Sequence, residues 1–257
     1  MSENMKSERI GEEGYNNFGS KMIITEYINN RKILVEFQDK YKAKVYSTYS
    51  HFKNHKIANP YDRTVYNIGY LGENKKQCDR IIYNEWFQML QRCYDPYHLN
   101  KCPTYIDCFV CDEWHNFQNF AKWYEENYYE CNNEKMNLDK DILCKGNKIY
   151  SPQTCVFVPQ RINLLFVKRD NYRGNLPIGC DIHKASNTIR VRCNIIENEK
   201  IKRKCLGYFS IDKPFQAFTC YKNFKENYIK QVADEYKDLI PMKLYDAMYR
   251  YEVEIND

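Results

Sequence analysis

Hydrophobic and polar side chains alternate along two short stretches in the last third of the chain. Ile178–His183 and Thr188–Ile195 both follow a period of two, which is typical of strands with one buried face. Residues 185–187 between them, Ala-Ser-Asn, have turn chemistry. We expect a polar loop over Glu197–Arg203 and a third strand over Lys204–Phe209. The pattern therefore predicts a three-stranded antiparallel sheet.

Successive side chains of a strand point to opposite faces of its sheet. In the second strand, the apolar face then consists of Ile189, Val191 and Cys193. The polar face consists of Thr188, Arg190, Arg192 and Asn194. After start signals at Asp212 and Pro214, large side chains recur at helical spacing, namely Phe215, Phe218, Tyr221, Phe224, Lys225 and Tyr228. We expect this helix to cover the apolar face and to leave the arginine face open.

The first half of the chain shows a second group of short strands, followed by two helices. Strands are expected over Met22–Tyr27, Ile33–Phe37 and Tyr41–Val45, and Val65–Asp79 has the composition of a connector. The two helices are marked by Trp86, Met89, Leu90 and Cys93 and by Trp114, Phe117, Phe120, Ala121, Trp123 and Tyr124. Because this spacing suits one buried stripe, we expect these aromatic residues to form a core rather than to stack on bases.

Charge is unevenly distributed along the chain, although the net charge is only +5. Residues 161–204 contain eleven basic and four acidic residues, whereas residues 112–141 contain eight acidic and three basic ones. A concentrated basic segment is typical of a surface that attracts phosphates, so it favours a nucleic-acid partner. We find no secretory signal at the start and no apolar run long enough to span a membrane, and we expect no membrane partner.

The twelve cysteines have two explanations. In a chain of this size without a signal peptide they are more typical of reduced thiols in an intracellular protein than of a disulfide scaffold. Cys108 and Cys111 form a Cys-x-x-Cys, and with Cys93 and Cys102 they offer four ligands for a structural zinc ion. A lone Cys-x-x-Cys is a weak signal, and we favour a packing turn between a strand and a helix.

A resemblance to a known DNA-binding domain is carried by four stretches of the basic segment. These are Ile178-Gly179, Ile189-Arg190-Val191-Arg192, Leu206-Gly207-Tyr208-Phe209 and the helix Ala217–Tyr221. They resemble the APETALA or ethylene-response type of domain, which also occurs in phage and mobile-element nucleases and lays its sheet in the major groove. The resemblance covers about a fifth of the chain. Together with the basic segment it implies the following DNA contacts: Arg169, Arg173, His183, Lys184, Arg190, Arg192, Lys202 and Arg203. The alternative is a solvated basic face without a partner.

The middle of the chain resembles the ββα-metal fold of phage HNH endonucleases. The resemblance is carried by Asn137–Leu143, by a loop with Gly146-Asn147-Lys148, and by Tyr150–Pro159. In that family a histidine deprotonates water and a divalent metal ion, usually magnesium, holds the scissile phosphate. The resemblance implies Asp139, Lys140, Asp141 and Asn147 as the catalytic positions, with Asp139 and Asp141 as magnesium ligands.

The catalytic histidine of that family is missing here, because no histidine lies between His115 and His183. The expected position falls in Leu138-Asp139-Lys140, and a lysine with an ordinary pKa is protonated at neutral pH and cannot act as a base. The alternatives are a weak nuclease with Asp139 as base, a nuclease whose base comes from elsewhere, and a non-catalytic remnant whose charged residues only pair with one another.

The sequence therefore predicts an α+β fold of modular construction. The expected parts are a flexible tail over 1–13, a small β module over 14–62, a helical and HNH-like ββα region over 63–168, an APETALA-type domain over 169–238, and a C-terminal helix and tail over 239–257. We expect a phage or mobile-element protein of the bacterial cytoplasm that binds double-stranded DNA, with magnesium-dependent cleavage or nicking if it is an active enzyme. The alternatives are an inactive regulator and a phage inhibitor that acts on a host defence complex through protein contacts. No oligomeric state is predicted.

Overall fold

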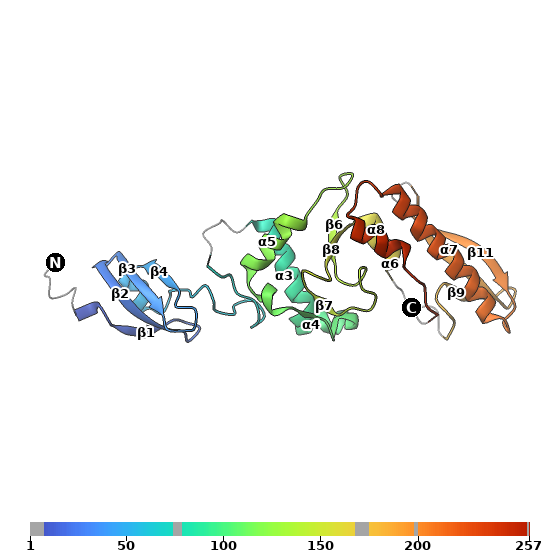
Figure 1. Ribbon diagram of the computed structural model, residues 1–257. Helices are drawn as coiled ribbons and strands as arrows, with labels where there is room; N and C mark the ends of the chain where they lie inside the picture. Colours follow the sequence, from blue (N-terminus) through green and yellow to red (C-terminus); the bar gives the residue numbers. More distant parts are fainter. Residues whose placement is uncertain (1–7, 74–78, 168–174, 198–199, 256) are drawn as a thin grey trace. The chain divides into compact units, whose positions relative to one another are not determined.

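The computed structural model describes residues 8–73, 79–167, 175–197, 200–255 and 257, and its fold is mixed α+β (Figure 1). The chain divides into two compact units. Unit 1 consists of Met1–Glu126 and Ile149–Ser151, and unit 2 consists of Asn127–Lys148 and Pro152–Asp257.

The first part of unit 1 is a four-stranded antiparallel sheet in the order β1-β2-β3-β4. Its strands are β1 (Glu13–Tyr15), β2 (Lys21–Asn29), β3 (Lys32–Phe37) and β4 (Lys44–Ser47). Alternate residues of β2 and β3 are buried, among them Met22, Ile24, Ile33, Val35 and Phe37, and α2 (Tyr49–Lys53) adds Phe52 to this core. The first two expected strands are confirmed.

The chain enters this sheet earlier than the expected tail suggests, and β4 begins later than expected. The Gly11 amide donates to the Ile24 carbonyl at 2.8 Å, so the segment before β1 already lies against β2. The carboxylate of Asp39 accepts the amides of Tyr41 and Lys42 at 2.8 and 3.0 Å, and these bonds hold a turn. The Phe37 amide closes the turn on the Ala43 carbonyl at 2.9 Å, so the strand starts at Lys44.

The rest of unit 1 is a helical part with an aromatic core. It contains α3 (Arg80–Tyr94), α4 (Pro96–Lys101), η1 (Pro103–Tyr105), η2 (Asp112–His115) and α5 (Phe117–Asn127), with a short parallel pair of β5 (Phe109–Val110) and β7 (Ile149–Tyr150). Trp86 and Trp114 are fully buried, and the Trp86 indole donates to the Trp114 carbonyl at 2.7 Å. The aromatic residues thus form a core, as expected, although Trp114 precedes α5 in a 3-10 turn.

Unit 2 begins with two antiparallel strands and a helix. β6 (Met136–Asp139) pairs with β8 (Val156–Pro159), and α6 (Gln160–Phe166) follows directly. Their apolar side chains share one core with the C-terminal half of α7 (Pro214–Glu235) and with α8 (Met242–Tyr249). The long helix α7 therefore joins this core to the C-terminal sheet.

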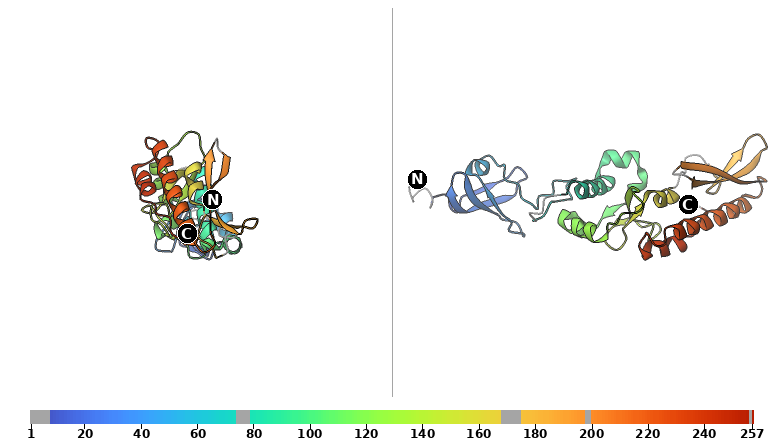
Figure 2. Two further views of the ribbon diagram at one scale, coloured as in Figure 1. Left: turned by 90° about the vertical axis from the view of Figure 1, so that its right-hand side faces the viewer. Right: turned by 90° about the horizontal axis from the view of Figure 1, so that it is seen from above.

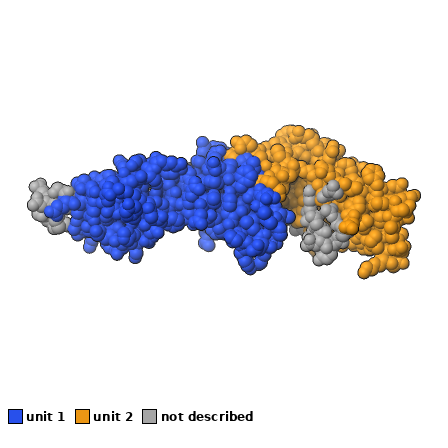
Figure 3. Space-filling model, turned by 90° about the horizontal axis from the view of Figure 1, so that it is seen from below, with its two compact units in different colours: residues 1–126, 149–151 blue, residues 127–148, 152–257 orange. Residues whose placement is uncertain are grey.

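The C-terminal sheet has the order β11-β10-β9 and is antiparallel throughout. Its strands are β9 (Cys180–His183), β10 (Thr188–Glu197) and β11 (Lys200–Phe209), and α7 runs along one face (Figure 2). The buried residues Ile189, Val191 and Cys193 pack on α7, so the expected apolar face is confirmed. Figure 3 shows the unit that contains this sheet in orange.

The expected polar loop over Glu197–Arg203 is wrong, because β11 already begins at Lys200. Lys200 pairs with Glu197, and Ile201 pairs with Ile196 across the ladder. The hydrogen bonds of a ladder join backbone groups, so a strand can continue through exposed basic residues once its partner is in place. The basic residues expected in a loop therefore lie on a strand.

Gly179 just before β9 makes a close contact that no other residue could make. Its φ is +79°, and an added Cβ would lie 2.1 Å from the Cδ2 atom of Tyr221 on α7.

In the part of the chain that the structure describes, no helix has both the length and the apolar composition to cross a membrane.

Candidate functional site

The face of the C-terminal sheet opposite α7 carries two arginines that share one carboxylate. Arg190 and Asp181 are paired across β10 and β9, which places both side chains on the same face. Arg190 Nη2 lies 2.7 Å from Asp181 Oδ2, and Arg192 contacts Oδ1 through Nη2 at 2.8 Å and through Nε at 2.9 Å. The cluster of Arg190, Arg192 and Asp181 therefore holds two ordered guanidinium groups and has a net charge of +1.

The two arginines also control the ionisation of Asp181. Burial by itself would raise the pKa of this carboxyl, but the hydrogen bonds and positive charges of Arg190 and Arg192 outweigh burial and lower it. Asp181 therefore stays ionised at neutral pH, and it holds the guanidinium groups of Arg190 and Arg192 in fixed positions.

The hairpin between β9 and β10 places a histidine and a lysine at one end of this face. The His183 ring stands edge-on to Tyr208 of β11, with 5.2 Å between the ring centroids, and its Nδ1 lies 2.8 Å from the Ser186 hydroxyl. Lys184 is exposed in the turn, and Asn187 closes the turn with a φ of +48°. These residues are accessible to a partner that lies along the sheet.

Strand β11 adds a row of exposed basic side chains, which are Lys200, Lys202, Arg203 and Lys204. Arg203 is paired with Asn194 and so shares the face of Arg192, whereas Lys202 and Lys204 point to the other side of the ladder. Of the expected DNA contacts, this sheet carries His183, Arg190, Arg192 and Arg203 on one face, Lys184 in the turn and Lys202 on the other side. Arg169 and Arg173 lie outside the described residues.

The second group of expected site residues lies at the end of β6. Asp139 is the last residue of that strand, and its Oδ1 accepts the backbone amides of Asp141 at 2.9 Å and Ile142 at 2.7 Å. Burial, and then the negative charge of Asp141, raise the pKa of Asp139 to about 6. Asp139 thus has a pKa close to neutrality and a firmly held side chain.

Lys140 occupies the space beside this carboxylate. Its ammonium group is buried and donates to Asp141 Oδ2 at 3.0 Å and to the Asn147 carbonyl at 3.2 Å. The Asn147 side chain in turn donates to the Lys140 carbonyl at 2.6 Å. Asp139, Lys140, Asp141 and Asn147 are therefore brought together, as expected for one site.

The donor set at this site does not fit a magnesium ion. A hard divalent cation needs several oxygen ligands at about 2.1 Å, and here an ammonium group already takes the Asp141 carboxylate and the Asn147 carbonyl. Across the described residues no three His, Cys, Asp or Glu side chains gather in a way that could hold a metal ion. A metal would have to displace Lys140.

The four candidate zinc ligands in unit 1 are not gathered into such a group either. Cys93 and Cys108 are buried in the core, and the Cys108 thiol faces the Thr104 carbonyl at 3.8 Å. Burial raises the pKa of the Cys111 thiol, which disfavours the thiolate that zinc binds. The Cys111 amide donates to the Tyr150 carbonyl at 2.9 Å, which ties this segment to β7 as a packing turn.

Sequence reasoning missed the role of Asp181. It lies in the first expected strand, and alternation along that strand places it on the same side as His183. That Asp181 lies opposite Arg190 follows only from the register between β9 and β10. The one signal in the sequence was that Asp181 is the single acidic residue among the basic residues of the first two expected strands, which favours an ion pair with them.

Comparison of the chain with protein-family models, with curated proteins and with solved structures finds no match in any of the three. Function is therefore inferred from the side chains and their geometry.

Proposed function

We propose that this chain binds double-stranded DNA through the arginine-bearing face and the β11 edge of its C-terminal sheet. The observation that carries the proposal is the pair of arginines whose guanidinium groups are ordered by Asp181, with Arg203 of β11 on the same face. The exposed side chains of Lys200, Lys202 and Lys204 add positive charge along the β11 edge, on the other side of the sheet. A three-stranded sheet packed on one helix is also the architecture expected of the APETALA-type domain, in which the sheet reads the major groove.

The charges of this sheet support phosphate contacts. Residues 175–197 and 200–209 contain seven Lys and Arg residues and two acidic residues. Cationic side chains near DNA release counterions, so their contribution to affinity depends steeply on salt concentration. Arg190 and Arg192 suit a second role, because a guanidinium fork can donate two hydrogen bonds to one guanine edge.

Salt-dependent binding to a fluorescent duplex tests the phosphate contacts. A Lys200→Gln, Lys202→Gln double variant removes two charges from β11, and Lys230→Gln with Lys237→Gln removes two charges from the region at the end of α7. Each lost phosphate contact should reduce the slope of log K against log salt by about 0.9, so we expect a slope smaller by about 1.8 only for the β11 pair. Equal effects of the two pairs, or no binding by the wild type, would contradict the proposal and favour the protein-contact alternative.

An Arg190→Lys variant tests base recognition on the arginine face. Lysine keeps the charge but lacks the planar fork. We expect discrimination between a preferred duplex, found by selection from a random library, and a scrambled one to fall by about 1–3 kcal/mol while the salt slope stays unchanged. Unchanged discrimination would show that Arg190 does not read bases.

Phosphodiester cleavage is a second candidate function, favoured by the pKa of Asp139. The strands β6 and β8 followed by α6 have the order expected of an HNH-like centre, and a carboxylate with a pKa of about 6 can accept a proton from water near neutral pH. The buried Lys140 ammonium weighs against it. Plasmid nicking in magnesium or manganese, compared between wild type and Asp139→Asn, separates the two: nicking that Asp139→Asn abolishes supports cleavage, and no nicking by the wild type leaves DNA binding alone.

A further inference from the structure

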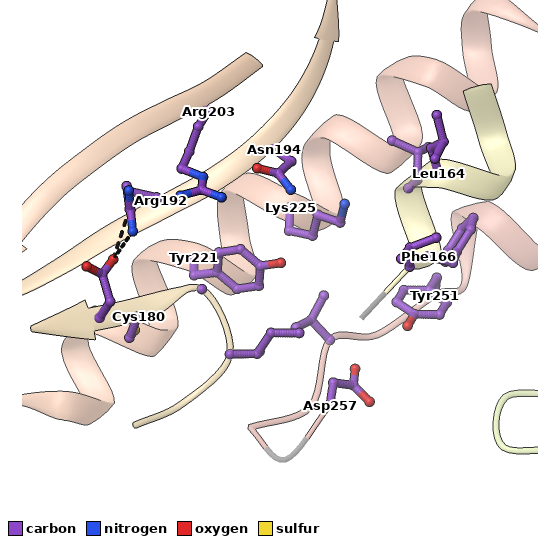
Figure 4. Close-up of a pocket in the computed structure, with 16 residues that line it drawn as sticks. Leu164, Phe166, Cys180, Arg192, Asn194, Arg203, Tyr221, Lys225, Tyr251 and Asp257 are labelled. Carbon is purple, nitrogen blue, oxygen red and sulfur yellow. Dashed lines mark hydrogen bonds and ion pairs between the residues drawn. The ribbon is translucent and has the colours of Figure 1, made fainter. Parts of the chain in front are cut away.

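Unit 2 contains a cleft of about 480 Å³ beside β10, beyond the last residue pair between β9 and β10. Asn194 and Arg203 reach it from the strands, Tyr221 and Lys225 from α7, and Phe166 and Tyr251 from the end of α6 and from the C-terminal segment (Figure 4). The volume is that of a site for a small organic molecule. Its wall combines cationic, amide and aromatic groups.

Lys225 is the most unusual residue of this cleft. It is only 8% exposed, and it has no ion pair or hydrogen-bond partner among the described residues. Burial lowers its pKa. The Cys193 thiol, whose negative charge would raise that pKa, is itself buried with a raised pKa and is therefore uncharged at neutral pH. A lysine side chain this deeply buried, with no acceptor for its ammonium group among the described residues, is unfavourable unless an anionic partner is bound.

The two acidic residues that line the cleft are already occupied by other cations. Asp181 pairs with the arginines of β10, and Asp257 accepts from Lys145 Nζ at 2.8 Å and from the Glu254 amide at 2.9 Å. Neither carboxylate is therefore left to neutralise Lys225. The cleft has a surplus of positive charge.

Two further donors share the wall with Lys225. The Arg203 guanidinium has no partner among the described residues, and neither does the Asn194 side-chain amide; Figure 4 shows both on the same side of the cleft as Lys225. Lysine and arginine offer donors and no acceptor. These donors together suit an acceptor with negative charge.

The opposite wall is apolar and aromatic. Phe166 and Tyr251 pack edge to face with 4.8 Å between their ring centroids, and Leu164 and Val253 extend this surface. An inorganic ion would leave this wall without contact. The lining therefore favours a ligand with an anionic end and an apolar body.

We propose that the cleft binds a small organic anion, with a phosphate or carboxylate group at Lys225, Arg203 and Asn194 and an aromatic or aliphatic body against Phe166 and Tyr251. The proposal goes beyond DNA binding. Arg192 and Arg203 line the cleft and also lie on the face proposed to contact DNA, but Lys200 and Lys202, which test the duplex contacts, do not line it, so the two proposals can fail separately.

Calorimetric titration of the full chain with four probes tests the assignment. Phenyl phosphate and benzoate carry both parts of the ligand, inorganic phosphate carries only the head, and benzyl alcohol carries only the body. We expect saturable binding of at least one aromatic anion, at least tenfold tighter than inorganic phosphate or benzyl alcohol; whether phenyl phosphate or benzoate binds more tightly identifies the head group. Absence of saturable binding by both anions, or equal binding of benzyl alcohol, would overturn the proposal.

A matched pair of variants locates the site on α7. Lys225→Met should weaken the aromatic anion at least tenfold, whereas Lys230→Met, a lysine of the same helix that does not line the cleft, should leave binding unchanged. Equal affinities of the two variants would overturn the assignment of the head group to Lys225.

Chemical labelling of the wild type gives a readout that needs no substitution. Acetic anhydride should modify Lys225 more slowly when phenyl phosphate or benzoate is bound, as measured by peptide mass spectrometry, with Lys230 unaffected. Lack of protection at saturating anion would contradict the site. If a duplex protects Lys225 while neither free anion does, the cleft belongs to the DNA surface and the small-ligand proposal is wrong.

Discussion

Asp139→Asn should stabilise the protein at neutral pH. The carboxyl is held in place by two backbone amides, which an asparagine Oδ1 can also accept. The substitution therefore removes the charge and keeps the turn. Because burial and Asp141 raise the pKa of Asp139 to about 6, the ionised form is disfavoured in the folded state.

The magnitude follows from linkage between protonation and folding. The unfolded pKa of an aspartate is about 3.9, so between about pH 4 and pH 6 the folded state binds more protons than the unfolded state, and stability falls as the pH rises through this range. A shift of about two units corresponds to about 3 kcal/mol once both states are ionised, and water that reaches the half-buried carboxyl reduces this figure. We expect a gain of about 2–3 kcal/mol at pH 7.5 and of about 1 kcal/mol at pH 4.5.

Hydrogen exchange measured by mass spectrometry is the suitable assay. All three tryptophans lie in unit 1, so tryptophan fluorescence does not report directly on unit 2. Peptides from β6, α6 and α7 of Asp139→Asn should exchange more slowly than those of the wild type at pH 7.5, with a smaller difference at pH 4.5 after correction for the intrinsic rate. Asp238→Asn, at an exposed position of the same unit, is the control and should change neither value.

Two outcomes would contradict the expected gain in stability. A destabilised Asp139→Asn at pH 7.5 would mean that the charge of Asp139 stabilises the fold, for example through Lys140. A gain of equal size at both pH values would mean that the effect does not arise from ionisation.

Three further predictions concern the C-terminal sheet and α7. Burial lowers the pKa of Lys225, so the charged side chain destabilises the folded state fully at pH values below its pKa in that state, and this effect fades as the pH rises towards about 10.4. In thermal unfolding, Lys225→Met should therefore be more stable than the wild type at pH 7 and nearly equal to it at about pH 10.5. Gly179→Ala should lower the stability of unit 2 by about 1–3 kcal/mol, measured by hydrogen exchange, because the new Cβ would overlap the Tyr221 ring. Gly146→Ala is the control and should lower the stability less, because Gly146 has the same φ of +79° but open space around it. Asp181→Asn should tighten non-specific duplex binding and steepen its salt slope by about 1 in fluorescence anisotropy, since it frees the charge of one arginine; weaker binding would show that orientation matters more.

Local patterns were sufficient for many of the elements. Strict alternation in residues 188–195 predicted both the strand and its two faces, because successive side chains of a strand point in turn to the core and to solvent. The aromatic stripe of α3 and α5 likewise predicted a core, since helical spacing places those residues on one side.

The start of β11 could not be read from local pattern. Lys200–Arg203 has three basic residues and one isoleucine, without a run of apolar alternation. It is a strand because β10 offers a row of backbone donors and acceptors beside it, and Ile201 lies opposite Ile196. The pairing partner thus overrides the composition of the segment.

The candidate sites divide in the same way. Alternation along the strands was sufficient to show which residue types share a strand face and that Asp139, Lys140 and Asp141 stand at the end of a strand. Which of these charges are neutralised depends on contacts between segments that are distant in the sequence. Asp181 pairs with Arg190 and Arg192, Lys140 donates to Asp141 and to the Asn147 carbonyl, and Lys225 has no acceptor among the described residues. Ion pairs form over about 3–4 Å, and strand register and helix packing, rather than separation along the chain, bring charges to that distance.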